Sequence, residues 1–283
     1  MLSGQIGRCG PNRKGAMQAY GVRAEEEGVR GGRAARRPAQ LARLAPLLAL
    51  LLAPLAGAGS SDPQWLDVES RIQYAFYTED QRSLGNVLDA LSAQEGSSPL
   101  RSYYLALANY RLALLRRAPG ARGDARAPAE RCADEAAEAR RSDADAAEAL
   151  ALESACLDLS AQLKALTAPL LRERSGSQLH RALELAPHNP RVLLIQALGE
   201  LAQHSKSAPG LAHLQQAIAA FETERAGTAQ APGWGAAEAY AALGRSYLER
   251  GDAIAARGAL EHALLLVPDF AYAHRLMARI TAG

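Results

Sequence analysis

The sequence predicts an all-α fold, an α-solenoid of antiparallel helix pairs, and three observations predict it. The composition is dominated by Ala, Leu, Arg and Glu, which lose little side-chain entropy in a helix. The few β-branched residues are scattered, and no alternating run is long enough for a strand. Aromatic residues make up only 5% of the chain, which favours a thin layer of packed helices over a thick globular core.

The first 58 residues differ from the rest and are expected to be a disordered leader followed by a signal peptide. Residues 1–32 are rich in Gly and Arg and show no apolar period. A basic stretch from Arg33 to Arg37 precedes the apolar run from Leu44 to Ala56. Small residues follow that run, which is the layout of a secretory signal peptide, with cleavage expected after Ala58.

An uncleaved membrane anchor is the alternative for this segment, although the apolar run is shorter than the roughly 20 residues of a comfortable span. The sequence therefore predicts a periplasmic protein, or else one anchored in the inner membrane and facing the periplasm. Membrane contact is expected only if the segment is retained. The part before Arg33 is longer than signal peptides usually carry, so we hypothesise a downstream translation start, at Val22 or Val29.

After the leader, residues 64–77 and 79–92 are expected to form an opening helical hairpin. A first helix of a repeat is expected over residues 103–115. A breaker-rich loop over 119–128 then precedes a helix at 129–141, and another helix is expected at 144–164. The residues expected to point inward from the opening hairpin are Trp65, Ile72, Tyr74, Leu84 and Leu88.

The second half of the chain repeats a pattern of apolar spacing followed by proline. Leu179, Ala182 and Leu183 before Pro187 match a later group that ends at Pro268. A helix over 211–224 is expected between two loops, and a terminal helix over 271–280 is expected to shield the last repeat. The two loops are 203–209 and 225–235, and the whole makes about four repeats plus flanking helices.

Residues 237–270 carry the most specific pattern. Tyr240, Leu243 and Tyr247 are expected on one stripe of a first helix. Gly244 lets a second helix approach closely, and the dipeptide 251–252 ends the first helix and caps the second. The positions that set this pattern are Tyr240, Leu243, Gly244, Tyr247, Gly251, Asp252, Ala256, Leu260, Ala263 and Pro268.

These spaced positions resemble the tetratricopeptide repeat (TPR) family. Tyr240 stands where the family favours Trp, and Leu260 stands where it favours Phe. The resemblance covers most of residues 59–283, expected to be one TPR-like domain, but it is specific only in 237–270. It implies a superhelix of helix pairs whose concave face binds a protein or peptide.

The charge balance argues against a nucleic-acid partner. The first 58 residues hold nine Lys and Arg and three Glu, so 23 of the chain's 32 basic residues and 27 of its 30 acidic residues lie in the rest. The part after the leader is thus about −4 net, and the apparent basicity belongs mostly to the leader. We expect no nucleic-acid binding, because its main electrostatic support is missing.

Two cysteines, Cys132 and Cys156, follow the leader. In an exported protein an even pair allows one disulfide. The interpretation that we prefer from sequence is two buried thiols on helix faces.

A search for catalytic, cofactor or metal sites returns none. The six histidines form no His-Glu-x2-His motif or zinc-binding pair. Ser175 and Ser177 lack the Gly-x-Ser-x-Gly context of a nucleophile, so a helix N-cap is the preferred role. We expect no enzyme and no cofactor, and a hydrolase hidden in the degenerate repeats is the less favoured alternative.

The remaining candidates are surface residues of the specific repeat. Glu238, Arg245 and Glu249 are expected to face the concave side, and Arg245 is the best anchor for a carboxylate because of its bidentate geometry. A solvated i, i+4 pair between Arg245 and Glu249 is the preferred alternative. Trp234 is expected to staple its loop to the following helix rather than to form an exposed contact.

The sequence therefore predicts a non-enzymatic TPR scaffold, exported to the cell envelope, that binds a protein or peptide. The alternative is a structural, membrane-anchored subunit of an envelope assembly complex.

Overall fold

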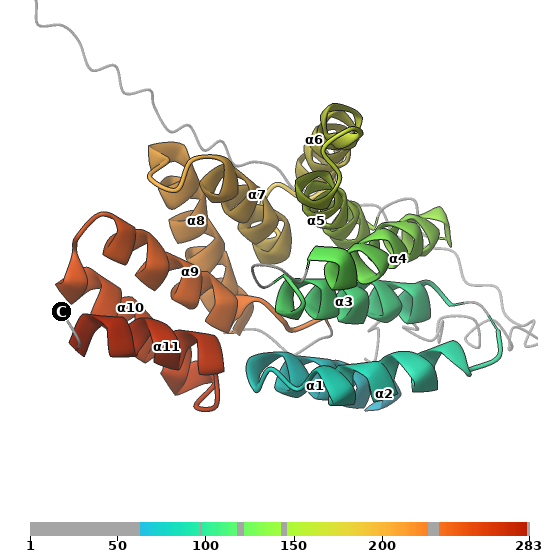
Figure 1. Cartoon of the computed structure of the whole chain (residues 1–283), viewed down its shortest axis with the longest axis horizontal. Helices are drawn as coiled ribbons and strands as arrows, with labels where there is room; N and C mark the ends of the chain where they lie inside the picture. The colour runs from blue at the N-terminus through green and yellow to red at the C-terminus, as the bar shows by residue number, and fades with distance from the viewer. Residues whose placement is uncertain (1–62, 97, 118–121, 143–145, 226–231, 282–283) are drawn as a thin grey trace, which may run out of the picture. The chain divides into compact units, whose positions relative to one another are not determined.

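A computed structural model describes residues 63–281 except 97, 118–121, 143–145 and 226–231. These residues belong to a unit that spans Gly57–Gly283, and the part described forms eleven α-helices without a strand (Figure 1). The expected leader and signal peptide, residues 1–58, lie outside the described residues, so they, the anchor alternative and the start site stay predictions. None of the helices in the described part has the length and apolarity to cross a membrane.

The helices follow one another with short connections. In chain order they are α1 (Pro63–Tyr77), α2 (Gln81–Ser92), α3 (Pro99–Leu115), α4 (Arg122–Ser142), α5 (Ala147–Leu163), α6 (Ala168–Leu185), α7 (Pro190–Gln203), α8 (Ala208–Arg225), α9 (Ala236–Glu249), α10 (Ala253–Leu266) and α11 (Ala271–Thr281).

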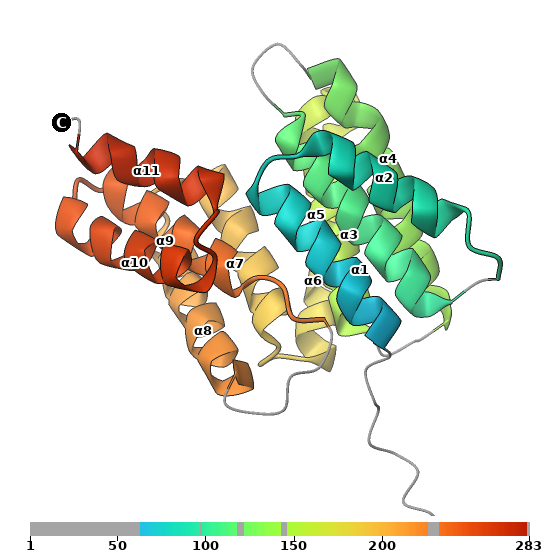
Figure 2. The same cartoon turned by 90° about the horizontal axis from the view of Figure 1, so that it is seen from below.

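Consecutive helices pack side by side as antiparallel pairs, with extensive packing within α3/α4, α5/α6, α7/α8 and α9/α10, and α4 packs on α5 as extensively as α9 packs on α10. The odd-numbered helices also touch one another: Figure 2 shows α1 beside α3 and α9 beside α11, and α5 contacts α7. One continuous hydrophobic core, mostly Ala and Leu, runs through the stack. The predicted all-α solenoid of helix pairs is confirmed.

The specific repeat has the local structure that its pattern predicts. The carboxylate of Asp252 accepts a hydrogen bond from the backbone N–H of Ala255 and so caps α10. Gly251 has a φ of +82°, the left-handed conformation that ends α9. A Cβ added to Gly244 would lie 2.6 Å from Cγ of Leu260, so the missing side chain is what allows α9 and α10 to pack this closely.

Two expected details of the first half are wrong. Tyr74 is 64% exposed, because the buried face of α1 carries Val68, Ile72 and Ala75 and places Tyr74 on the other side. Pro128 lies inside α4 rather than in a loop. A proline inside a helix removes one backbone hydrogen bond, and the burial of alanines such as Ala129 against the core offsets that loss.

Ser175 is not a helix N-cap. It lies in the middle of α6, which begins earlier because Pro169 favours the first turn of a helix. Its hydroxyl is buried and lies 2.9 Å from Oγ of Ser154 on α5. Ser177 lies in the same helix, so neither serine caps it.

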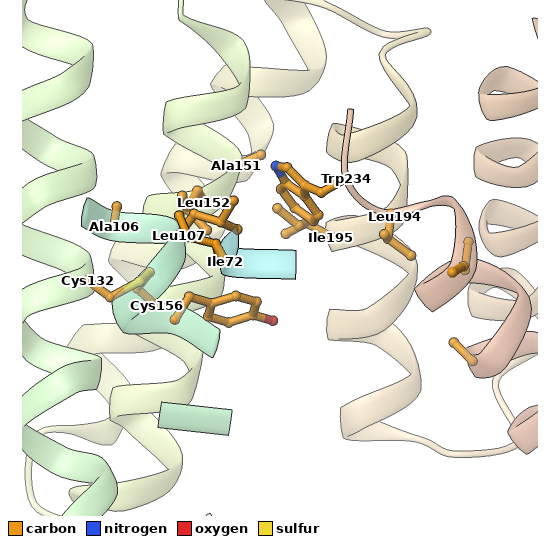
Figure 3. Close-up of a cluster of buried hydrophobic side chains, with 14 of the residues drawn as sticks. Ile72, Ala106, Leu107, Cys132, Ala151, Leu152, Cys156, Leu194, Ile195 and Trp234 are labelled. Atoms are coloured by element: carbon orange, nitrogen blue, oxygen red, sulfur yellow. A yellow bond between two sulfur atoms is a disulfide. The ribbon is translucent and has the colours of Figure 1, made fainter. Parts of the chain in front are cut away.

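Cys132 of α4 and Cys156 of α5 form a disulfide, with Cα atoms 5.7 Å apart (Figure 3). The sequence interpretation as two buried thiols was therefore wrong. Both residues are fully buried, and they lie on the facing surfaces of two helices that pack along one another. Spacing along the sequence does not reveal which faces of two helices meet.

Candidate binding groove

The odd-numbered helices surround a cavity of about 860 Å³. Every one of α1, α3, α5, α7, α9 and α11 contributes side chains to its wall, whereas the even-numbered helices contribute only Gln81 and Arg172. We call this cavity the inner groove. Its volume lies within the range of roughly 300–1,000 Å³ that is typical of ligand sites.

The wall of the inner groove is mainly apolar. Aromatic residues come from α1, from α3, from the segment before α9 and from the region around the start of α11, and aliphatic residues come from α3, α5 and α7. The principal apolar side chains are Phe76, Tyr110, Leu114, Leu159, Leu194, Ile195, Leu198, Trp234, Phe270 and Tyr272.

The charged residues of the wall leave an excess of positive charge. Arg111 is 3% exposed and forms an ion pair with Glu238, and Arg275 forms one with Glu79. Within the wall, these pairs leave Asp158 opposite three arginines, which are Arg117, Arg172 and Arg245. Arg245 also lies 3.7 Å from Glu249, which is outside the wall. The inner groove thus has more positive than negative side chains, in a chain whose residues 59–283 are net negative.

The first and last helices meet along one side of the inner groove. The hydroxyl of Tyr77 in α1 donates a 2.7 Å hydrogen bond to Glu238 in α9, and its ring lies edge-on to Phe270, with centroids 4.8 Å apart. Arg275 of α11 donates to both carboxylate oxygens of Glu79, just after α1. These contacts hold α1 against the C-terminal helices.

The segment before α9 is pinned to helices far away in the sequence. Trp234 is 2% exposed, and its indole N–H donates to the hydroxyl of Tyr103 at 2.8 Å. The backbone N–H of Gly233 donates to Glu69 at 2.8 Å. Trp234 is therefore buried, as a staple would be, but the partner of its N–H lies on α3 rather than on the following helix; Figure 3 shows it with Leu194 and Ile195.

Burial changes the acidity of two carboxyl groups near the groove. Burial raises the pKa of Glu69, and the hydrogen bonds from Gly233 and Tyr104 oppose that rise only in part. Burial also raises the pKa of Asp158, although the hydrogen bond from Ser175 and the charge of Arg172 act against it.

The three residues predicted for the concave face occupy different environments. Glu238 is 9% exposed and already engaged by Arg111 and Tyr77. Arg245 lines the inner groove and its Nε lies 3.7 Å from Glu249, so the preferred i, i+4 pair is present. Glu249 is not part of the groove wall. That these residues contact a partner stays a prediction.

Arg111 was not singled out from the sequence. It interrupts an apolar run in α3, which is the signal that could have found it. Its guanidinium lies 4.1 Å from the ring centroid of Phe76 and 4.9 Å from that of Trp234. Burial between two rings stabilises a cation that would otherwise be costly to desolvate.

No group of three His, Cys, Asp or Glu suited to a metal ion occurs in the part of the chain that the structure describes. The expected absence of an enzyme, a cofactor or a metal stays a prediction.

No family model and no curated protein sequence matches the chain. The solved structures that are similar to it include the following two. One is a thermophilic TPR protein of Thermus thermophilus, with a TM-score of 0.52, 16% identity, and coverage of 78% of this chain and 99% of that one. The other is the HusA haemophore from Porphyromonas gingivalis, with a TM-score of 0.52, 21% identity, and coverage of 68% and 96%.

At these identities the likeness concerns the fold. The chain has a TPR-like fold, an all-α solenoid of helix pairs whose first helices line an inner face. Repeat folds of this kind present extended concave surfaces.

Proposed function

We propose that this chain is a non-catalytic binding module of the cell envelope that holds a segment of another protein in the inner groove. One observation carries the proposal: all six first helices of the solenoid contribute to a single groove. An apolar wall with a few charged groups suits a peptide, because the wall buries side chains and the charges set orientation.

Two features support a location outside the cytoplasm. The segment before residue 59 has the layout of a secretory signal peptide. The disulfide between Cys132 and Cys156 is of a kind that persists in oxidising compartments such as the periplasm.

The test is capture of a partner by the chain, cross-linked in the native envelope and purified under denaturing conditions. Arg245→Glu should abolish recovery of a specific partner if the inner groove is used. Arg257→Glu is the matched control, because Arg257 forms the same i, i+4 type of pair on the outer helix α10. Equal recovery with both variants would count against the groove.

A membrane-anchored subunit of an envelope assembly complex is the alternative form of this proposal. Fractionation of membranes with a high-salt wash distinguishes the two forms. A retained anchor keeps the chain in the membrane pellet, whereas a cleaved signal releases it to the soluble fraction.

A second candidate ligand is a small amphipathic ring system, and the specific observation in its favour is the aromatic and arginine-lined cavity of about 860 Å³. One of the similar solved structures is a haemophore, so haem is the probe to use. Haem added to the purified chain should give a saturable absorbance change that Arg245→Glu weakens and Arg257→Glu, on the outer helix α10, leaves unchanged. Equal absorbance changes in these two variants would remove this candidate.

A further inference from the structure

We infer that the segment held in the inner groove carries an acidic side chain beside apolar ones, and that Arg245 binds its carboxylate. This inference rests on the proposed function and names the chemistry of the ligand. The first observation behind it is that two donors in the groove wall lack an acceptor.

Two buried donors without a hydrogen-bond partner belong to residues of the inner groove wall. Four buried side-chain nitrogen or oxygen atoms in the described part of the chain lack a hydrogen-bond partner. Two of them are the Nε atoms of Arg111 and Arg245, which reach the groove from α3 and α9; the others are Oγ of Ser160 and Ser246. Buried polar groups are almost always paired in native proteins, so this pattern indicates a missing acceptor.

The two arginines are not equally accessible to a ligand. Arg111 is 3% exposed and its guanidinium is engaged by Glu238, so it positions the groove wall rather than meeting a ligand. Arg245 is 34% exposed, and its nearest carboxylate, Glu249, is 3.7 Å from Nε, which is beyond hydrogen-bond distance. The guanidinium of Arg245 can therefore donate hydrogen bonds to a ligand carboxylate that lies closer than Glu249 does.

The surrounding charges favour an anion. Neither Arg117 nor Arg172 forms an ion pair within 4 Å in the described part of the chain, and both line the same groove. Because Glu79 and Glu238 are already paired, Asp158 is the carboxylate of the described wall that remains to oppose an incoming carboxylate. In a positive groove where Arg245 is only 34% exposed, the attraction is stronger than in open solvent.

The groove wall also determines which ligand side chains can lie next to the ligand's carboxylate. Ala241 and Ala242 line the groove one turn before Arg245 on α9, and Ile195 and Leu198 line it from α7. Only apolar side chains gain by burial there. An acidic residue flanked by Leu or Phe therefore fits, and a uniformly acidic segment does not.

Three matched fluorescent decapeptides test the inference. All contain Ala, Leu and Phe with an amidated C-terminus, and they differ only in two central residues, which are Glu, Gln or Lys. Binding to the chain is measured by fluorescence anisotropy. The Glu peptide should bind about tenfold or more tightly than the other two, since a charge-assisted hydrogen bond is lost in each of those. Equal binding of the Glu and Lys peptides would overturn the inference.

Two variants locate the carboxylate. Arg245→Gln should weaken the Glu peptide by about tenfold and leave the Gln peptide unchanged. Arg257→Gln, on the outer side of α10, should change neither. If both variants bind the Glu peptide as the unchanged chain does, Arg245 is not the anchor and the inference fails.

The experiments distinguish a failure of the acidic-ligand inference from a failure of the proposed function. If the groove captures a protein partner but prefers the Lys or Gln peptide, the acidic chemistry is wrong and peptide binding stands. If no peptide binds and no partner is captured through the groove, both fail. A peptide whose only carboxylate is a free C-terminus should bind no better than its amide; tighter binding would contradict an internal acidic residue.

Discussion

The hydroxyl of Tyr77 in α1 donates to the carboxylate of Glu238 in α9, across 161 residues of sequence. Arg111 of α3 pairs with the same carboxylate. One buried acid thus joins three helices from both halves of the solenoid, beside the inner groove. Substitutions that break this junction should therefore also change the shape of the inner groove.

Removing Arg111 alone should lower the free energy of unfolding more than removing both members of its ion pair with Glu238. Arg111→Leu leaves the carboxylate of Glu238 buried with only Tyr77 as a donor, and such a loss typically costs about 3–5 kcal/mol. Adding Glu238→Gln should recover much of that free energy of unfolding, because the neutral amide still accepts from Tyr77. Urea denaturation measures both; additive losses in the double variant would contradict the pairing.

The close approach of α9 and α10 at Gly244 should show in alanine variants. Gly244→Ala places a Cβ 2.6 Å from Leu260, so we expect a loss of about 1–3 kcal/mol. Gly258→Ala is the matched control in α10, where an added Cβ meets nothing within 4 Å. That variant should gain up to about 1 kcal/mol from helix propensity. Thermal denaturation that ranks the two in the opposite order would refute the packing.

The buried carboxyl group of Glu69 should make stability depend on pH. Because burial raises its pKa above the unfolded value of 4.5, the folded chain holds the proton more tightly than the unfolded chain. The contribution of Glu69 is therefore fully present below pH 4.5 and is lost as the pH rises through the folded pKa. The free energy of unfolding, measured relative to Glu69→Gln, should fall as the pH is raised from this value toward neutrality; a rise would contradict the sign.

Reduction of the disulfide should destabilise the solenoid. Cys132 and Cys156 are 24 residues apart, and closing a loop of that length stabilises by about 3 kcal/mol on the chain-entropy account. The urea midpoint should fall in dithiothreitol, and the double variant Cys132→Ala, Cys156→Ala should not respond to the reductant. Two thiols per chain at these positions, titrated in denaturant without reductant, would show that the bond does not form.

The features that the sequence predicted are local ones. The contact of Gly244 with Leu260 and the cap at Asp252 lie within one repeat, so their spacing along the chain reports their structure. The contacts that shape the groove are not local. Trp234 bonds to Tyr103 across 131 residues, so its partner depends on how the whole solenoid curves.

The predicted groove residues show the same limit. Arg245 was predicted from its helix face and does line the groove. Glu238 lies on that helix too, yet it is buried by partners 127 and 161 residues away. Helical periodicity assigns a residue to a face, but it does not tell which other helix covers that face.

Site-specific photo-cross-linking tests the central claim most directly. A photoreactive amino acid at Gln162, an exposed groove residue of α5, is compared with one at Ile254, which is 89% exposed on α10 and outside the groove wall. We predict that only the chain labelled at Gln162 forms a discrete adduct with an envelope protein or peptide. Adducts of equal yield at both positions, or at Ile254 alone, would contradict binding in the inner groove.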